Sequence, residues 1–276
     1  MWQRIRTALV LLVVVGFAMF ATQIAYPILT LLAVMVAVAG YEWAKLIPNH
    51  TQAFSYGYAL VLAVSSALLN WLMLDKGTTV LPITLGLAVA TWLPCIVWVI
   101  NYPNKTKHWH NNCLTVLGAL LLPATALAMY FLWRISPWWL LYVFLLVWCA
   151  DSGAYFVGRK FGKRKLAPKV SPNKSVEGLL GGLLLGGLVA FGVTLTQWQR
   201  WGAGVALGFL SLSLITIVVS VFGDLFESML KREAGVKDSG RILPGHGGVL
   251  DRIDSQLSAM PVFAFGWYWL GFFGWY

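Results

Sequence analysis

The stretch SMLKREAGVKDSGRILPGHGGVLDRID, from Ser228 to Asp254, is a highly charged insert in an otherwise apolar chain. Its charged residues are Lys231, Arg232, Glu233, Lys237, Asp238, Arg241, Asp251, Arg252 and Asp254. His246 lies among glycines in the segment PGHGG. Long apolar runs precede and follow this segment, so we interpret the rest of the chain as a membrane-embedded frame that holds it in place.

The composition of the chain is that of a membrane protein. Of 276 residues, 59% are hydrophobic and 11% are charged, and the mean hydropathy is +0.74. Soluble domains carry about 25% charged residues. Apolar runs recur at about 20 residues, the length that a helix needs to cross a bilayer. We therefore predict an all-α polytopic membrane protein.

We predict about nine transmembrane helices, because each apolar run is close to the length of one crossing. The predicted spans are 7–22, 26–44, 54–74, 79–100, 114–133, 137–157, 178–198, 202–222 and 257–276. For the last span, which contains Pro261, a re-entrant segment is the alternative to a full crossing.

The distribution of Lys and Arg predicts the orientation. With the N-terminus in the cytoplasm, seventeen of these residues fall inside, and Lys76, Arg134 and Arg200 fall outside. This asymmetry follows the positive-inside rule and predicts an external C-terminus. It assigns the net charge of +10 to cytoplasmic loops rather than to a nucleic-acid surface. We expect a bacterial inner membrane, where anionic headgroups also account for the basic run Arg159–Lys169.

Acidic residues concentrate in the second half of the chain. Eight of the ten follow residue 150, whereas the first half has Glu42 and Asp75. We therefore expect two regions. Residues 1–135 form an N-terminal set of about five membrane helices, and residues 136–276 form a catalytic region of about four helices with two basic cytoplasmic loops.

Two segments of this second region are candidate binding elements. Asp151 lies within a predicted span, and an ionisable residue there marks a functional site unless it forms a purely structural ion pair. In SPNKSVEG (171–178), Ser171 followed by Pro172 predicts the start of a helix, with Lys174 and Glu177 on its first turn. A helix N-terminus beside a lysine is suited to bind phosphate.

The charged insert and the helix before it predict a metal and phosphate site. Asp224, Ser228 and Lys231 are spaced to share one helical face. The glycines around His246 let backbone amides approach an anion. Mg²⁺ prefers a few carboxylate oxygens together with phosphate oxygens and water, so we predict Asp224 and Asp251 as metal ligands. This combination indicates metal-assisted phosphoryl-type transfer.

The pattern S-x-L-K-R-x4-K-D-x-G-x2-L-P-x-H-G-G-V-x-D-R-I-D, which fills residues 228–254, resembles the signature of the phosphatidate cytidylyltransferase family. SPNKSVEG and ADSGAYFVGRKFGK (150–163) also resemble segments of that family. The resemblance implies that CTP and phosphatidic acid give CDP-diacylglycerol and pyrophosphate with Mg²⁺, a second metal ion being an open alternative. It also implies a cytoplasm-facing polar active-site cavity in the C-terminal half, and a homodimer surrounded by membrane lipids, without nucleic acid.

The resemblance also implies roles for individual residues. Asp224 and Asp251 would bind metal and, with Lys231 and His246, form the catalytic set. The substrate-binding set would be Ser171, Asn173, Lys174, Arg232, Lys237, Arg252 and Asp151. Because the lipid phosphate is already anionic, a strong general base is not required, and His246 is expected to position phosphate.

Other functions remain as alternatives. A CTP-dependent polyprenol or phytol kinase would have similar metal and phosphate requirements. A membrane ion transporter would explain acids within the spans, but not the basic residues and the glycine-flanked His246 outside them. A CDP-alcohol phosphotransferase is excluded, because its signature requires an Asp-Gly dipeptide and this chain has none.

Overall fold

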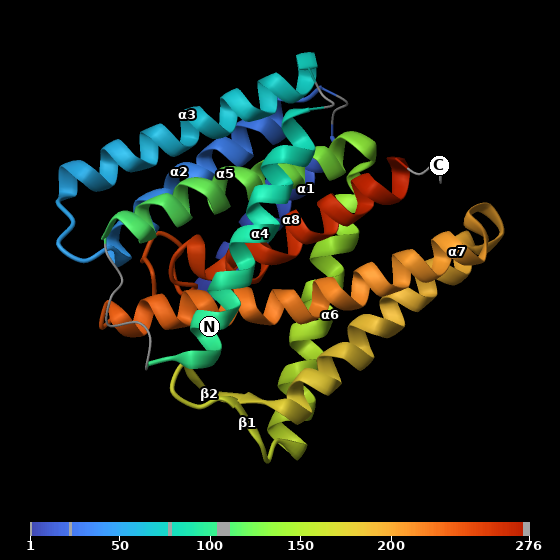
Figure 1. Cartoon of the computed structure of the whole chain (residues 1–276). Coiled ribbons are helices and arrows are strands. Elements are labelled where there is room, and N and C mark those ends of the chain that lie inside the picture. Colours follow the sequence, from blue (N-terminus) through green and yellow to red (C-terminus); the bar gives the residue numbers. More distant parts are fainter. Residues whose placement is uncertain (1, 22–23, 77–78, 104–110, 273–276) are drawn as a thin grey trace.

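The computed structural model describes residues 2–21, 24–76, 79–103 and 111–272, and these fold into helices and one small hairpin (Figure 1). The elements are α1 (Trp2–Phe20), α2 (Tyr26–Leu46), α3 (Gln52–Lys76), α4 (Val80–Asn101), α5 (Asn111–Ile135), α6 (Pro137–Phe161), β1 (Lys165–Ala167), β2 (Ser171–Ser175), α7 (Val176–Glu233) and α8 (Leu250–Phe272). The all-α class is thereby confirmed.

Helix α7 consists of two arms joined at Gly202. The backbone there has φ 69° and ψ 171°, a conformation that glycine adopts at little cost. Figure 1 shows the two arms folding back on each other, so that the start and the end of α7 lie at the same end of the molecule. The joint therefore brings the hairpin and the charged insert together.

Six helices in the described residues are long and apolar enough to cross a membrane, which makes the chain a multi-pass membrane protein. They are Tyr26–Leu46, Gln52–Met73, Val80–Asn101, Asn112–Ile135, Pro137–Phe161 and Val176–Glu233. The predicted spans 178–198 and 202–222 both lie in α7. The predicted spans 7–22 and 257–276 correspond to α1 and α8, which are helical but are not among these six. The structure does not describe Lys105 and Lys107, two of the basic residues counted on the cytoplasmic side. The last four residues of span 257–276 also lie outside the described residues.

Glycines hold α6 and the first arm of α7 close together. A Cβ at Gly182 would lie 2.8 Å from the carbonyl oxygen of Ala150, and one at Gly178 would lie 2.9 Å from that of Ala154. Such short distances leave no room for a larger residue. These two glycines of α7, four residues apart, thus pack against α6 of the same chain, as small residues do where membrane helices approach closely.

The predicted helix start at Ser171 is wrong. Ser171–Ser175 is a strand that pairs antiparallel with Lys165–Ala167, and α7 begins at Val176. Ser175 is the N-cap, since its Oγ accepts a hydrogen bond from the Gly178 amide at 3.1 Å. The carboxylate of Glu177 accepts bonds from the amides of Lys163 and Arg164, which ties the hairpin to the first turn of α7. Ser175 therefore takes the capping role that the sequence assigned to Ser171.

Helix α8 forms the centre of the fold. It packs against α4, α5 and α7, and its residues from Ser255 to Pro261 are all buried. Trp92 of α4 donates its indole N–H to the carbonyl oxygen of Leu257 at 3.1 Å, and Thr125 of α5 donates to the same oxygen at 3.3 Å. Pro261 lies inside α8, where it removes a backbone donor, yet the helix continues to Phe272.

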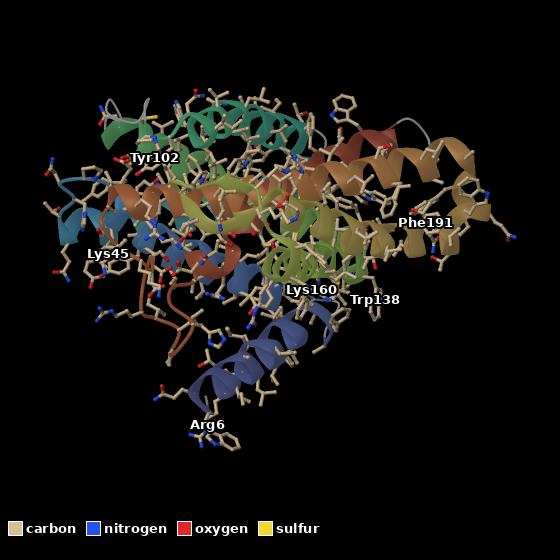
Figure 2. The ribbon with its side chains drawn as sticks, turned by 90° about the horizontal axis from the view of Figure 1, so that it is seen from below. Arg6, Lys45, Tyr102, Trp138, Lys160 and Phe191 are labelled. Atoms are coloured by element: carbon tan, nitrogen blue, oxygen red, sulfur yellow. The ribbon has the colours of Figure 1, made fainter. Side chains whose placement is uncertain are left out.

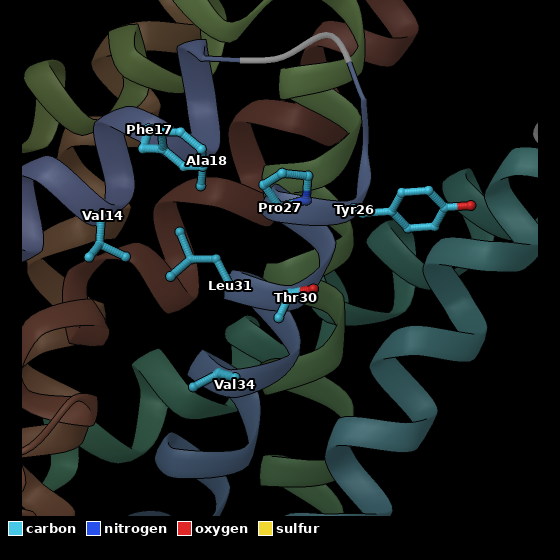
Figure 3. A pocket seen from close by; sticks show the side chains of 8 residues that line it. All are labelled: Val14, Phe17, Ala18, Tyr26, Pro27, Thr30, Leu31 and Val34. Carbon is cyan, nitrogen blue, oxygen red and sulfur yellow. The ribbon is translucent and has the colours of Figure 1, made fainter.

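Helix α1 lies at the edge of the molecule, and Figure 2 shows it projecting from the other helices, with Arg6 near its free end. A hydrogen bond joins it to the charged insert, where Thr7 Oγ1 donates to the carbonyl oxygen of Pro244 at 3.0 Å. Between α1 and α2 lies an apolar pocket of about 540 Å³ (Figure 3). It is lined by Val14, Phe17, Ala18, Tyr26, Pro27, Thr30, Leu31 and Val34. None of these described lining residues is charged, so the pocket does not provide a phosphate site.

Candidate active site

Lys231, near the end of α7, lies between two buried carboxylates. Its Nζ is 2.5 Å from Oε2 of Glu227, one turn earlier, and 2.6 Å from Oδ1 of Asp251 on α8. The exposed fractions of these side chains are 13% for Lys231, 0% for Glu227 and 5% for Asp251. Because buried charges are costly unless they are paired, this bridge fixes the end of α7 to the start of α8.

Asp251 is also held by the loop that precedes it. Its Oδ2 accepts hydrogen bonds from the Ser239 amide at 3.0 Å, the Ser239 hydroxyl at 2.9 Å and the Gly248 amide at 2.8 Å. Burial alone would raise the pKa of Asp251, but the bonds from Lys231, Gly248 and Ser239 outweigh it and hold that pKa below its usual value. Asp251 is therefore a charged anchor on which the loop closes.

The glycine-rich turn around His246 has the tight geometry expected from its sequence. Gly245 and Gly247 have φ angles of 76° and 83°, and the Leu243 amide donates to the carbonyl oxygen of Gly247 at 2.9 Å. The amide of His246 donates to Leu243, and the amide of Gly248 donates to Asp251. The sequence predicted that backbone amides of this turn bind an anion of the substrate. The amides of His246 and Gly248 instead donate to acceptors within the protein.

A second ion pair joins the hairpin to α7. Lys174 Nζ on β2 lies 2.6 Å from Oδ2 of Asp224, and both side chains are about a quarter exposed, at 25% and 29%. Ser228, one turn after Asp224, donates to Oδ1 of that carboxylate at 3.2 Å. Gly223 lets α8 approach at this level, since a Cβ there would lie 2.6 Å from the carbonyl oxygen of Asp254. The backbone of α8 therefore comes close to α7 beside Asp224.

The two ion pairs belong to one cluster of charges, which we call the acid–lysine cluster. Asp151 of α6 lies within electrostatic reach of Lys174 and Asp224, and Asp254 of α8 lies within reach of Asp224, Glu227 and both lysines. The members of the cluster are Asp151, Lys174, Asp224, Glu227, Lys231, Asp251 and Asp254. Carboxylates outnumber ammonium groups in it, so the cluster favours a cation.

The donor set of this cluster fits a magnesium ion that shares its coordination with phosphate. In the part of the chain that the structure describes, no three His, Cys, Asp or Glu side chains are arranged as a metal site. Mg²⁺ commonly takes one or two carboxylates and completes its coordination with phosphate oxygens and water. Asp224 and Asp254, on facing helices, can supply such a pair. Both oxygens of Asp224 and both of Asp251 have protein partners, but the side chain of Asp224 is 29% exposed, whereas that of Asp251 is 5% exposed.

Another group of the predicted residues lines a separate polar pocket of about 670 Å³. Its lining consists of Lys237, Asp238, Gly240, Arg241, Leu243, Gly245, His246, Gly247 and Arg252. The Nδ1 atom of His246 is buried and has no hydrogen-bond partner among the residues that the structure describes. The pocket brings together Lys237, His246 and Arg252, three of the predicted phosphate or nucleotide contacts, in a setting with four basic side chains.

Four of the predicted contacts lie at the hairpin, namely Ser171, Asn173, Lys174 and Arg232. On β2, Ser171 is half-buried and Asn173 is exposed beside Lys174. Arg232 of α7 donates its Nε–H to the carbonyl oxygen of Val170 at 3.4 Å. The hairpin is therefore attached to the end of α7 through Arg232 and through the Lys174–Asp224 pair. The structure brings Lys174 into the acid–lysine cluster and leaves Asn173 exposed.

Four residues of this region were missing from the predicted site. Glu227 and Asp254 belong to the acid–lysine cluster, Ser239 binds Asp251, and Glu42 reaches the loop from α2 through a bond to the Leu250 amide at 2.8 Å. The spacing of Glu227 from Lys231 is a signal for an i, i+4 pair. Glu42 gave no such signal, because 208 residues separate it from its partner.

Comparisons with known proteins identify the family of this chain. The family model of the cytidylyltransferase family matches residues 2–269. The phosphatidate cytidylyltransferase of Haemophilus influenzae is 41% identical over 97% of this chain and 99% of its own length. That of Pseudomonas aeruginosa is 42% identical over 95% of both chains, and that of Brucella suis is 35% identical over 83% of this chain and 80% of its own. This chain therefore belongs to the cytidylyltransferase family.

Proposed function

We propose that this protein is a phosphatidate cytidylyltransferase, which converts CTP and phosphatidic acid into CDP-diacylglycerol and pyrophosphate. The observation that carries the proposal is the acid–lysine cluster beside a basic pocket, at the point where α7 and α8 meet the hairpin. The relatives that share 41–42% identity over nearly the whole chain bear the same name.

The reaction joins two polyanions. An oxygen of the lipid phosphate forms a bond to the α-phosphorus of CTP, and the bond from that phosphorus to the β-phosphate oxygen breaks, so that pyrophosphate leaves. The nucleophile is already anionic, and the protein must mainly offset repulsion and stabilise the leaving group. Lys237, His246 and Arg252 can bind the triphosphate in the polar pocket, and Lys174 can contact phosphate from the hairpin side.

Asp224 and Asp254 would hold Mg²⁺, and a bound Mg²⁺ would neutralise charge on the phosphate oxygens. Asp251 was the other ligand expected from the sequence. Its hydrogen bonds with Ser239, Gly248 and Lys231 favour a different role, in which it fixes the loop and keeps Lys231 in place. Lys231 also forms an ion pair with Glu227, which is buried one turn earlier on α7.

The orientation in the membrane follows from the chemistry of the substrates. Phosphatidic acid keeps its acyl chains in the bilayer, whereas CTP arrives from the cytoplasm, so the site belongs at the inner membrane–water boundary. The hairpin and the loop 234–249 lie at one end of the molecule (Figure 1), and they contain many of the basic residues that predict the cytoplasmic side. We propose nine crossings, a cytoplasmic N-terminus, a bacterial inner membrane and a homodimer.

The test is the fate of labelled CTP with purified protein in detergent, phosphatidic acid and Mg²⁺. Label from the α-phosphate is expected in the lipid product, because cytidylyl transfer moves that phosphorus. Transfer of the γ-phosphate instead would mean a lipid kinase and would refute the proposal. An equal reaction without any divalent cation would refute the part assigned to Mg²⁺.

A further inference from the structure

Glu42 is a buried acid in the half of the chain that does not contain the charged insert. It lies near the end of α2, and its exposed fraction is 1%. Its Oε2 accepts a hydrogen bond at 2.8 Å from the amide of Leu250, the first residue of α8. Because the first amides of a helix have no partner inside that helix, a carboxylate at this position stabilises the start of α8.

The other oxygen of Glu42 packs against two glycines of the charged insert. A Cβ at Gly240 would overlap Oε1 of Glu42, and one at Gly248 would lie 2.6 Å from both carboxyl oxygens. Neither glycine has a positive φ angle, so the backbone conformation does not require glycine there. At Gly240 the carboxylate of Glu42 occupies the space of a side chain, and at Gly248 this space is shared by that carboxylate and the Ser239 hydroxyl.

Glu42 and Asp251 hold the same loop from two sides. Glu42 contacts Gly240, Gly248 and Leu250, whereas Asp251 binds Ser239 and Gly248. Adjacent residues of the loop are thus fixed between an acid of α2 and an acid of α8. The chain between these attachment points contains His246 and most of the lining of the polar pocket.

We propose that Glu42 is a positioning residue of the active site, which holds the loop 239–250 so that Asp251, Lys231 and the basic pocket keep their geometry. The inference rests on the proposed function, because its main readout is cytidylyl transfer. It makes the N-terminal region part of the machinery, although that region contributes no side chain to the acid–lysine cluster.

The first experiment compares Glu42→Ala, Glu42→Gln and Tyr41→Phe in the CTP assay. Glu42→Ala is expected to lower kcat/KM about tenfold or more, with KM for CTP raised, because a displaced loop misplaces its phosphate contacts. Glu42→Gln keeps the shape and an acceptor for the Leu250 amide, and is expected to stay within about threefold of the wild type. Tyr41→Phe, the neighbouring residue on α2, should leave the kinetics unchanged.

The changes in kcat and in KM for CTP separate a positioning role of Glu42 from a purely structural role. A structural role would reduce the amount of folded enzyme and so lower the apparent kcat, while KM for CTP stayed the same. That result would overturn the proposal, and so would a kcat/KM of the Glu42→Ala variant within about twofold of the wild type. If the wild type itself does not form CDP-diacylglycerol, the proposed function fails instead, and the two failures are distinguishable.

A second experiment uses the contact between Glu42 and Gly240. It does not depend on whether the Glu42→Ala variant folds. Gly240→Ala should lower kcat/KM about tenfold in the wild type, because its Cβ overlaps the carboxylate. Asp is one methylene shorter than Glu, so in the Glu42→Asp background the same substitution should cost far less. Equal losses in both backgrounds would mean that Glu42 does not set the space at Gly240, and would overturn the proposal.

Discussion

Lys231 bridges two carboxylates that the fold buries on different helices, and its loss would leave both without a counter-charge. Breaking a buried ion pair on one side costs about 3–5 kcal/mol. We therefore expect Lys231→Met to lower the thermal unfolding midpoint of the detergent-purified protein strongly and to abolish activity. Glu227→Gln alone should cost less, since Lys231 keeps its bond of 2.6 Å to Asp251.

The double variant Lys231→Met with Glu227→Gln tests whether the two residues act as a pair. Residues in one network are not additive, so the double variant should lose less stability than the sum of the two single variants. Simple additivity of the shifts in unfolding midpoint would show that the contact between Lys231 and Glu227 does not contribute.

The three aspartates near the site are expected to respond differently to magnesium. Asp224→Asn and Asp254→Asn should raise the Mg²⁺ concentration needed for half-maximal activity, because each removes a carboxylate from the proposed ligand pair. Asp251→Asn should lower kcat by about a hundredfold without that shift, since it disturbs the loop and Lys231. The measurement is activity against Mg²⁺ concentration after treatment with a chelator. A magnesium shift for Asp251→Asn alone would restore the ligand assignment made from the sequence.

At the scale of elements, the packing of α6 against the first arm of α7 depends on glycine. A Cβ at Gly181 would overlap Val157, whereas Gly192 on the same arm has open space around it. Gly181→Val is therefore expected to destabilise the protein by about 1–3 kcal/mol or more, the usual cost of overpacking. Gly192→Val is the matched control and should change the unfolding midpoint much less. Equal shifts in the two variants would contradict the α6–α7 contact.

Elements also differ in how far the sequence predicts them. The apolar helices were predictable because their length and hydropathy are local properties. The hairpin was not, because Ser171-Pro172 has the local chemistry of a helix start and strand pairing with Lys165–Ala167 depends on another segment. The serine four residues later, Ser175, caps α7 instead, and only the pairing of the two strands decides between them.

At the scale of the whole molecule, the orientation can be measured by cysteine labelling in intact cells. A cysteine in place of Lys165 on β1, which is exposed, should be protected from a membrane-impermeant thiol reagent until the membrane is opened. A cysteine in place of Arg200, beside the joint of α7, should be labelled from outside. The reverse pattern would invert the proposed topology.

The sequence by itself determined the membrane class, the family resemblance and the residues of the charged insert, because hydropathy, charge asymmetry and a fixed motif are all properties of contiguous chain. It also named Asp224, Lys174, Lys231 and Asp251 as site residues. Only the tertiary structure decided how these pair: Lys174 with Asp224, and Lys231 with Glu227 and Asp251. The joint at Gly202 and the burial of α8 bring these segments together. The same folding places Glu42 against the loop, and no local pattern can reveal a contact that spans 208 residues.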